Sequence, residues 1–468
     1  MSDRPIRILH LGLGRFHRAH QAVYMERMAH LGDASWGISA FSMRSPDARD
    51  HMRAVELRYP VVETENAAKP DTPAKDAPEV DPGYNTIWIE SIREVGFAID
   101  DRELLLARIR DAGVKIITLT ITEKGYNLTP TGDLNLENPE VKNDLADPLH
   151  PKTAVGILGL LFRERALHGR RPLSVVSCDN LRENGRKLEK TVRTYLSRLS
   201  GDDWDKALDF VADDVSFPSS MVDRIVPELS EQTKAAIEAA SGTSHPELLA
   251  TEEFTQWVIE DRFVGGRPSW DRVFVDFVRD IRPFEEMKLR LLNATHSMLA
   301  YLGTLRGHSF VHEAISDPFI EELARKMMFE EVSPLLEKFH RKDRLAEYCE
   351  RLIARFRNEK LPHRLLQIAA DGSEKIQQRI LPSLVVAGEG PHSALVMALA
   401  SWILFLHKRM TGGFEIADPR ATKLKGLMTT DLSAFAEKVL KEPEWMASLS
   451  NNEKLRKETL AALGAIQS

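Results

Sequence analysis

The pattern of hydrophobic residues along the chain changes near residue 280. Before that point, short apolar runs rich in Val, Ile and Leu alternate with segments of helical periodicity. The expected strands are "IRILHLG" from residue 6, "WGISAFS" from residue 36, "VKIITLTIT" from residue 114 and "RPLSVVS" from residue 171. Strands that alternate with helices indicate a mostly parallel sheet covered on both faces. We therefore expect an α/β domain over residues 1–280.

After residue 280, long segments with helical periodicity replace the β-rich runs, which predicts a largely α-helical domain over residues 281–468. Its most apolar run, "SALVMALASWILFLH" at 393–407, is shorter than the roughly 20 residues that span a bilayer. Basic residues follow it directly, so we expect a buried helix. The polar, Pro-rich segment 64–85 is expected to be a surface loop or an excursion between two strands.

Composition excludes several classes of protein. The chain has 468 residues, of which 43% are hydrophobic, enough for real cores. A net charge of −7 and the lack of a long basic stripe argue against a nucleic-acid binder. The two cysteines, Cys178 and Cys349, lie far apart, and the chain starts without a signal peptide. We expect a cytoplasmic protein without a membrane segment.

The turn after the first strand, "GLGRFH", carries Gly12, Gly14 and Phe16, with His17 where a dinucleotide fingerprint usually has its third glycine. We expect an uninterrupted helix after this turn. Small residues let the backbone approach a pyrophosphate, and the start of a helix supplies free N–H groups. His17 implies a looser helix–strand contact than usual. A plain strand-to-helix turn remains the alternative.

The second expected strand ends in "SMRSPDARD", where a carboxylate would bind the hydroxyls of an adenosine ribose. Asp47 is the candidate, with Asp50 behind it. A carboxylate repels a 2′-phosphate, which favours NAD over NADP, whereas Arg44 could accept that phosphate. His17 and His20 have no acidic or cysteine partner nearby, so we expect no metal site.

The segment "EEMKLRLLNATHS" at 285–297 places an amine, an amide and an imidazole among leucines. At about 100° per residue, Lys288, Asn293 and His296 share one arc of a helix. Polar groups in such a place cost free energy unless they have partners. The chain lacks zinc-ligand spacing and any Tyr with Lys four residues on, so Lys288 is the natural acid/base for carbonyl chemistry.

Two opposing expectations apply to the Lys288 amine. Apolar neighbours and a positive nicotinamide ring would both favour its neutral form, as a base requires. The alternative is a lysine that extends to solvent from the start of a helix, paired with Glu285 or Asp280.

Across nearly its whole length the chain resembles the polyol-specific long-chain dehydrogenases, which include mannitol dehydrogenase, fructuronate reductase (mannonate oxidoreductase) and tagaturonate reductase. The motifs that carry the resemblance are "GLGRFHRAHQ", "TLTITEKGYN", "VSCDNLRENG", "FPSSMVDRIVP", "QWVIEDRF", "GRPSW", "KLRLLNATHS" and "DGSEK". The resemblance implies a Rossmann-like N-terminal domain, a helical C-terminal domain and chemistry without a metal.

The resemblance also implies roles for single residues. Lys288 would be the acid/base, and Asn293 and His296 would orient the substrate. Asn180 would join Asn293 in stabilising the oxyanion. The remaining implied substrate residues are Asp223 in "MVDR", Lys375 in "DGSEK" and Glu285, which would lie on a proton path to solvent.

Three departures from the mannitol-type sequences indicate the branch. "TEKGY" has Lys124 where those sequences usually have glycine, and "DNLRENG" adds Arg182 and Glu183. Gln367, just after His363 and Arg364, stands where those sequences tend to carry an arginine eight residues before the "DGSEK" lysine. These changes resemble fructuronate reductase, and they mostly add cations that could bind a carboxylate. We therefore expect NAD-dependent interconversion of D-fructuronate and D-mannonate.

Four alternatives stay open. Three concern the protein: a mannitol 2-dehydrogenase or a related polyol dehydrogenase, a tagaturonate reductase, or a non-catalytic relative. The fourth is that Lys124 and Arg182 are surface residues that vary between subfamilies without a role in binding. The expected partner is a small sugar acid or polyol, and the oligomeric state stays open, with a monomer among the options.

Overall fold

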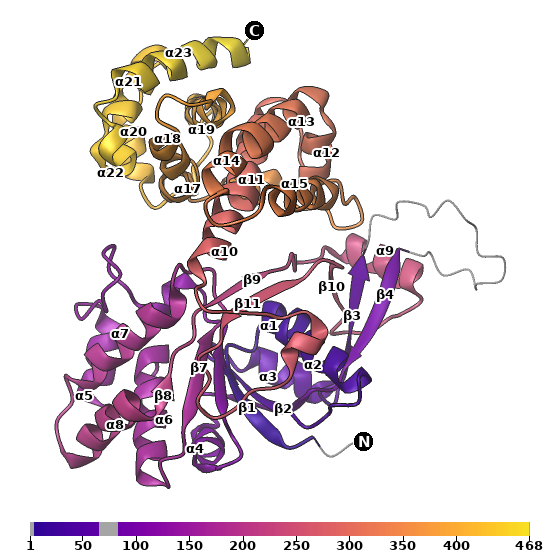
Figure 1. The fold of residues 1–468 in the computed structure, drawn as a ribbon, viewed down its shortest axis with the longest axis vertical. Helices are drawn as coiled ribbons and strands as arrows, with labels where there is room; N and C mark the ends of the chain where they lie inside the picture. The colour runs from indigo at the N-terminus through magenta and orange to yellow at the C-terminus, as the bar shows by residue number, and fades with distance from the viewer. Residues whose placement is uncertain (1–3, 65–82, 468) are drawn as a thin grey trace. The chain divides into compact units, whose positions relative to one another are not determined.

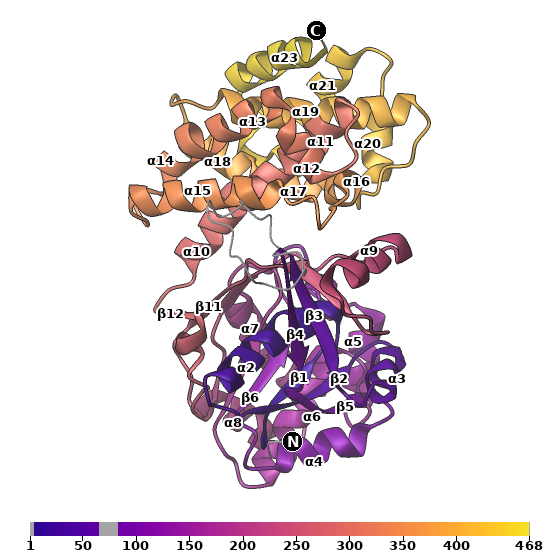
Figure 2. The same ribbon diagram turned by 90° about the vertical axis from the view of Figure 1, so that its right-hand side faces the viewer.

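The structure is a computed structural model that describes residues 4–64 and 83–467 (Figures 1 and 2). It divides into two compact units, Met1–Arg282 and Pro283–Ser468. The sequence placed the division at residue 280. Each unit has its own hydrophobic core, and each is described by itself below.

A six-stranded parallel sheet forms the centre of the N-terminal unit, in the order β5-β2-β1-β6-β7-β8. Its strands are β1 (Ile6–Leu11), β2 (Gly37–Ser42), β5 (Ile92–Phe97), β6 (Ile116–Leu119), β7 (Leu173–Ser177) and β8 (Val215–Ser216). The chain builds outward from β1 to one side through β2, then returns and builds to the other side from β6. Ligands bind at such a switch point in open parallel sheets. The expected parallel sheet is confirmed.

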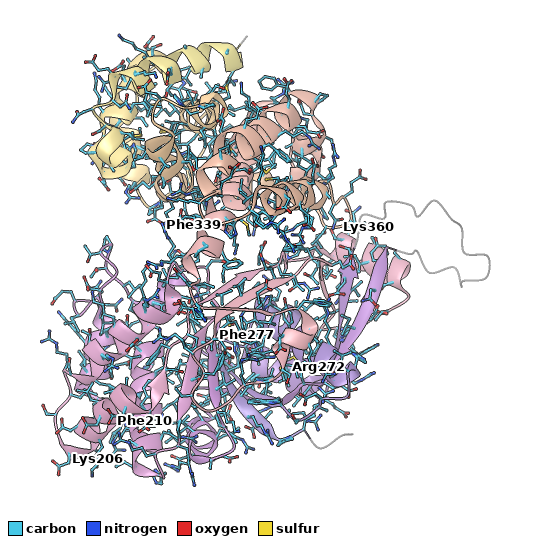
Figure 3. The ribbon with its side chains drawn as sticks, in the orientation of Figure 1. Lys206, Phe210, Arg272, Phe277, Phe339 and Lys360 are labelled. Carbon is cyan, nitrogen blue, oxygen red and sulfur yellow. The ribbon has the colours of Figure 1, made fainter. Side chains whose placement is uncertain are left out.

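Alternate residues of each strand enter two separate cores, because successive side chains in a strand point to opposite faces. Leu9, Ile117 and Val175 pack with helices α4, α6, α7 and α8 on one face. Ile8 and Ile116 pack with α1, α2 and α3 on the other face. Phe210, labelled in Figure 3, packs with its ring tilted against that of Phe162 from α6. The helices and short turns of this unit are α1 (Arg15–Ala19), α2 (Gln21–His30), α3 (Asp47–Ala54), α4 (Arg102–Arg110), η1 (Glu123–Tyr126), α5 (Pro139–Ala146), α6 (Ala154–Leu167), α7 (Asn184–Leu196), α8 (Asp202–Asp213), α9 (Glu231–Ser241) and η2 (Trp270–Val273).

Two three-stranded sheets accompany the central one, in the orders β10-β3-β4 and β12-β11-β9. Their strands are β3 (Tyr59–Thr64), β4 (Tyr84–Ile89), β9 (Ser220–Asp223), β10 (Leu249–Glu252), β11 (Gln256–Glu260) and β12 (Asp276–Val278). The antiparallel pair β3 and β4 flanks the polar segment expected to be a loop. Most of that segment, residues 65–82, lies outside the described residues.

Helices make up the C-terminal unit. They are α10 (Arg282–Met287, which begins at the last residue of the N-terminal unit), η3 (Lys288–Asn293), α11 (Ala294–Leu305), α12 (Val311–Ser316), α13 (Pro318–Arg325), η4 (Lys326–Val332), α14 (Ser333–Leu336), α15 (Lys342–Phe356), α16 (Leu365–Ala369), α17 (Gly372–Arg379), α18 (Leu381–Ala387), α19 (Ser393–Thr411), α20 (Ala421–Leu427), α21 (Leu432–Lys441), α22 (Pro443–Met446), η5 (Ala447–Leu449) and α23 (Glu453–Gln467).

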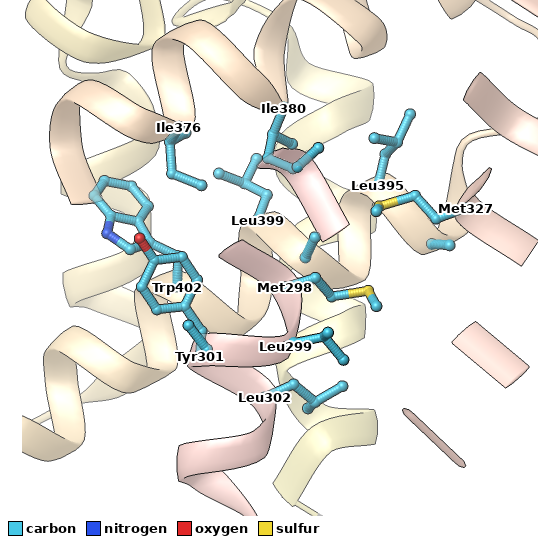
Figure 4. Close-up of a cluster of buried hydrophobic side chains, with 14 of the residues drawn as sticks. Met298, Leu299, Tyr301, Leu302, Met327, Ile376, Ile380, Leu395, Leu399 and Trp402 are labelled. Atoms are coloured by element: carbon cyan, nitrogen blue, oxygen red, sulfur yellow. The ribbon is translucent and has the colours of Figure 1, made fainter. Parts of the chain in front are cut away.

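The core of this unit forms where α11 packs against α19. Figure 4 shows Met298 and Leu302 of α11 with Leu395 and Leu399 of α19 in one cluster. Among the described residues, α19 alone is long and apolar enough to cross a membrane by length and composition, yet most of it is buried here. The expectation of a buried helix at 393–407 is confirmed.

The segment Lys288–Asn293 is a π-helix rather than an α-helix. The backbone N–H of Ala294 bonds to the carbonyl of Leu289, five residues back. Wider turns rotate less per residue, so the arc computed above at 100° per residue is wrong for this segment. The π-helical turn carries Asn293 closer to the face of Lys288 than α-helical geometry would. A second π-helical segment, η4, contacts it.

Candidate functional site

The glycine turn follows β1 and packs against the residue after the neighbouring strand β6. Gly12 has φ +109°, and a Cβ there would lie 2.1 Å from the carbonyl oxygen of Thr120. Only glycine fits such a position. Gly14 then caps the start of α1, and the ring of Phe16 stacks on His20 with centroids 4.8 Å apart. This turn is open enough for a backbone approach to a phosphate.

The sequence predicted an uninterrupted helix after the turn, and this prediction is wrong. It breaks at His20, whose φ of −119° and ψ of −85° separate α1 from α2. The His20 ring is buried, and its Nε2 lies 3.2 Å from the carbonyl oxygen of Gln256. That tertiary contact outweighs local helix propensity. His17 lies three residues before His20 and is fully buried. Its ring stacks on that of His10, with centroids 3.4 Å apart.

The two carboxylates after the end of β2 have different partners, a serine for Asp47 and an arginine for Asp50. Asp47 is exposed at the start of α3 and accepts a hydrogen bond from Ser45 Oγ at 3.0 Å. Asp50 is ion-paired with Arg49 at 2.7 Å. Arg44 is exposed nearby in sequence. Asp47 therefore stays the candidate for ribose recognition, and Asp50 is a structural partner of Arg49.

Asp179 holds the turn that carries Lys124. Its buried carboxylate accepts bonds from the backbone N–H groups of Ile121 (3.1 Å) and Thr122 (2.8 Å) and from the Tyr126 hydroxyl (2.7 Å). Burial raises the pKa of Asp179 above its usual value. The loops after β6 and β7 are thereby joined at the carboxyl end of the sheet. Lys124 is exposed on this turn.

The loop after β7 presents Asn180 and Arg182, both exposed, and is fixed from below by Asn184. The buried Asn184 amide donates to the carbonyls of Ser177 (3.2 Å), Asp179 (3.0 Å) and Ser220 (2.8 Å). Its Oδ1 accepts from the Ser220 backbone N–H at 2.9 Å. This bonding brings the end of β7 beside β9.

Asp223 lies at the end of β9 and is buried. The residue after it, Arg224, is also buried and donates to the carbonyl of Ala19 at 2.5 Å and to Glu63. Arg224 thus fixes the chain directly after Asp223. The N-terminal unit places Asn180, Asp223 and Lys124 on loops or strand ends that follow β7, β9 and β6.

In the C-terminal unit, Lys288 begins the π-helical turn and is buried, with 8% of the residue exposed. His296 is buried about two turns further along, on α11, and its ring packs at a tilt of 51° against Phe356 with centroids 4.7 Å apart. Burial lowers the pKa of His296 well below its usual value, and the neighbouring His363, Arg355, Arg379 and Lys288 lower it further. The imidazole is therefore neutral at neutral pH.

Lys375 on α17 belongs to the same neighbourhood. Its Nζ donates to the carbonyl of Ile368 at 3.0 Å. Burial lowers the pKa of His363, and the charge of Lys375 lowers it further. His363 in turn packs edge-on against His296, with centroids 5.9 Å apart. Lys288, His296 and Lys375 are thus brought together through His363.

Arg364 lies apart from this group. Its guanidinium lies 5.3 Å from the ring centroid of Phe310, with which it forms an isolated antiparallel bridge. In an extended backbone, successive side chains point to opposite sides. Because His363 faces His296, Arg364 faces away from that ring. Glu285 is buried one helical turn before Lys288, and Asn293 is half-buried at the end of the π-helical turn.

Each of the two units matches a model of a known protein domain. A model of the mannitol dehydrogenase Rossmann domain matches residues 6–272, and a model of the mannitol dehydrogenase C-terminal domain matches residues 280–467. The chain belongs to the mannitol dehydrogenase family. Family membership makes it an oxidoreductase that acts on the hydroxyl groups of polyols or sugars.

Individual members of the mannitol dehydrogenase family match over most of their length. D-mannonate oxidoreductase of Escherichia coli is 37% identical over 425 residues, covering 88% of this chain and 83% of the relative. Mannitol 2-dehydrogenase of Aspergillus fumigatus is 34% identical over 473 residues, covering 98% and 90%. The structure of Pseudomonas fluorescens mannitol 2-dehydrogenase in a ternary complex with NAD and D-mannitol is 30% identical, with a TM-score of 0.83 and coverage of 100% and 93%.

Sequence reasoning missed three residues that hold candidate site residues in place within their own units. Arg379 donates from Nη1 to the carbonyl of Asn293 at 3.2 Å and to Ser297 Oγ at 3.1 Å. It lies four residues after Lys375 on α17, a spacing that places both on one face and could have indicated it. Asp179 and Asn184 sit within motifs already singled out, but their burial could not be read from the motif.

Proposed function

We propose that the protein is an NAD-dependent reductase that interconverts D-fructuronate and D-mannonate. The observation that carries this proposal is the cationic surrounding of two buried imidazoles. Lys288, Arg355 and Arg379 all lower the pKa of His296, and Lys375 lowers that of His363. Positive charges gathered beside these imidazoles would favour an anionic sugar over a neutral one.

The glycine turn supports a dinucleotide at the switch point of the sheet. Gly12 admits no side chain, and a Cβ at Gly14 would meet only the Gly12 carbonyl oxygen, at 3.7 Å. Gly12, Gly14 and Phe16 would hold the pyrophosphate end of NAD, and Asp47 would hold the ribose hydroxyls. Arg44 is the contact that NADP would use instead. Bound NADH supplies the hydride that reduces the keto carbon.

The residues of this chain handle the proton and the charge. Lys288, as the ammonium, gives its proton to the alkoxide oxygen as that oxygen forms. The amides of Asn180 and Asn293 donate to the same oxygen and stabilise its charge. Neutral His296 orients a substrate hydroxyl without adding charge, and Glu285 returns a proton to Lys288 from solvent. The balance is fructuronate + NADH + H⁺ ⇌ mannonate + NAD⁺.

The carboxylate of the substrate is bound by cations. Lys124 is our first candidate, because it distinguishes "TEKGY" and lies on a turn that Asp179 holds in place. Arg182 and Lys375 are further candidates, and Asp223 accepts bonds from substrate hydroxyls. Arg364 ranks last, because its guanidinium lies over Phe310. The proposal places this chemistry in the cytoplasm, on a small sugar acid.

Mannitol 2-dehydrogenase is the second candidate function. The solved ternary complex with NAD and D-mannitol covers this whole chain at 30% identity, and that enzyme takes a neutral polyol. Purified protein should therefore be assayed for NADH oxidation with fructuronate, tagaturonate, fructose and xylulose. The proposal expects the highest kcat/KM with fructuronate. A preference for fructose would favour the second function, and a preference for tagaturonate would keep the acid but change the sugar.

A further inference from the structure

A chain of buried polar side chains runs beneath the glycine turn, and the proposed reaction does not use it. His10 Nδ1 lies 2.8 Å from Thr118 Oγ1, and Thr118 Oγ1 lies 2.9 Å from the side-chain amide of Gln21. Gln21 in turn faces the imidazole of His17. All four residues are buried on the strands β1 and β6 or the helices α1 and α2.

The other nitrogen of His10 faces the turn itself. His10 Nε2 lies 3.0 Å from the carbonyl oxygen of Gly12 and 3.0 Å from Thr120 Oγ1. The Thr120 hydroxyl also donates to the Gly12 carbonyl, at 2.7 Å. Gly12 is the residue whose φ of +109° makes the turn possible. The polar chain therefore ends on the peptide group that sets the direction of the turn.

The number of available donor hydrogens fixes the direction of each hydrogen bond in this series of side chains. A carbonyl oxygen only accepts, so His10 Nε2 must carry the ring proton. Burial lowers the pKa of His10 to about 3, so the ring is neutral and Nδ1 is an acceptor. The single hydroxyl proton of Thr118 must then point at Nδ1. The Gln21 atom beside Thr118 must consequently be a donor, which means its NH₂ group.

The structure places Gln21 Oε1 beside Thr118, and this direction of the bonds requires the reverse orientation of the amide, which is assigned from bonding rather than from atom positions. Gln21 Nε2 and both ring nitrogens of His17 are buried and make no hydrogen bond within the described part of the chain. Reversal places the acceptor Oε1 on the side of the His17 ring, which carries one N–H donor. The opposite direction would place two acceptors, His10 Nε2 and the Gly12 oxygen, 3.0 Å apart.

We propose that Gln21, Thr118 and His10, with His17 stacked on His10, form a buried hydrogen-bond relay that ends on the Gly12 carbonyl and positions the turn for the dinucleotide. The proposal rests on the proposed function in one respect, the binding of NADH at this turn. His10 is a positioning residue, since it acts on the cofactor through Gly12. The stacked rings of His10 and His17 also fill the space between strand and helix where the fingerprint usually has glycine.

The first test is the tautomer of His10. Protein labelled with ¹⁵N in histidine should show His10 as the Nε2–H tautomer, assigned by the signal that His10→Gln removes. Thr118→Val removes the donor to Nδ1, so the Nδ1 signal should shift toward that of an acceptor without a hydrogen bond while the Nε2–H tautomer persists. Thr191→Val is the matched control, because Thr191 is buried in the same unit and donates only to the carbonyl of Lys187. It should leave both the tautomer and the Nδ1 signal unchanged.

The second test is the dissociation constant of NADH. His10→Leu removes the bond to Gly12 and should weaken NADH binding about two- to tenfold, with kcat at saturating NADH nearly unchanged. His10→Gln keeps an N–H donor near the Nε2 position and should bind NADH within about twofold of wild type. Thr191→Val should lose stability but bind NADH normally. Melting temperatures of all variants confirm that each is folded.

Two results would overturn the relay: a wild-type His10 in the Nδ1–H tautomer, or His10→Leu that binds NADH as tightly as wild type. A folded wild-type protein that does not bind NADH would overturn the proposed function instead. The tautomer measurement needs no cofactor and would still decide the direction of the relay.

Discussion

Arg379 donates from Nη1 to the backbone carbonyl of Asn293 at 3.2 Å and thereby ties α17 to the end of the π-helical turn. A second bond from the same nitrogen reaches Ser297 Oγ at 3.1 Å. Through these bonds, the helix that carries Lys375 is fixed against the turn that carries Lys288. The relative placement of the two lysines therefore depends on a residue to which the family resemblance assigned no role.

Arg379→Met should lower kcat/KM for the sugar substrate about 10- to 100-fold, because a charge-assisted hydrogen bond contributes about 1.5–3 kcal/mol. Arg379→Lys should recover only part of that loss, since an ammonium cannot reproduce the planar fork. Arg357→Met is the control, because Arg357 pairs with Glu321 at the surface. Steady-state kinetics and NADH binding should be measured together. Unchanged kinetics in Arg379→Met would show that the π-helical turn holds its geometry without α17.

Lys288→Ala should reduce turnover by about 10²–10⁴-fold, the range typical for loss of a proton-transfer group, while NADH binding survives. Lys326→Ala is a matched control, because Lys326 also begins a π-helical segment but is exposed. Turnover is measured by NADH oxidation, and binding by fluorescence titration. Near-wild-type turnover in Lys288→Ala would exclude Lys288 as the acid/base.

Lys124→Gly should lower kcat/KM for fructuronate about 10- to 150-fold and change that for fructose much less, since a neutral ketose has no carboxylate to lose a partner. Lys124→Gln separates the charge from the length of the side chain. The informative quantity is the ratio of the two kcat/KM values in each protein. If that ratio stays constant, Lys375 and Arg182 become the next candidates for the carboxylate.

Asp47→Ala should weaken NADH binding and narrow the difference between NADH and NADPH, because the carboxylate would no longer repel a 2′-phosphate. Asp50→Ala is the control, since the Asp50 carboxylate is paired with Arg49 at 2.7 Å. The dissociation constants of NADH and NADPH should be measured for wild type and both variants. A wild-type preference for NADPH would transfer the ribose contact to Arg44.

Stability should fall as the pH drops below about 6.5, the ordinary pKa of histidine in an unfolded chain. His10, His17 and His296 have folded-state pKa values depressed by burial, to about 3 for His10. Between those values and pH 6.5 the unfolded state binds more protons, so each depressed histidine lowers the free energy of unfolding by ~2 kcal/mol at pH 5. Melting temperatures at pH 7.5 and 5.0 test this. His10→Gln should flatten the dependence, whereas exposed His150→Gln should not.

The sequence predicted the parallel sheet, the helical second unit and the buried helix α19, because these follow from hydrophobic periodicity over many residues. It could not predict the π-helical turn. An α-helix and a π-helix share the same apolar pattern over six residues, and the choice between them depends on contacts from η4 and Arg379. The break at His20 was missed for the same reason, since its partner Gln256 is remote in sequence.

For the candidate site, the residue types came from motifs and the placement came from the structure. Lys288, His296 and Lys375 proved to be neighbours through His363, while Arg364 turned out to face Phe310. No spacing rule relates positions 288 and 375, so only the packing of α17 against η3 could bring them together.

The π-helical turn also has a consequence for how insertions and deletions act on the C-terminal unit. A wider turn contains an extra residue relative to an α-helix, so removing Leu291 would let the helix run through with ordinary i→i+4 bonding. The residues on either side of the turn would keep their register, so the core shown in Figure 4 would stay packed. Lys288 and Asn293 would then be separated by four α-helical steps instead of five wider ones, which changes their spacing on the helix but not the fold. A single codon lost at this point would therefore alter the candidate site and leave the core in place.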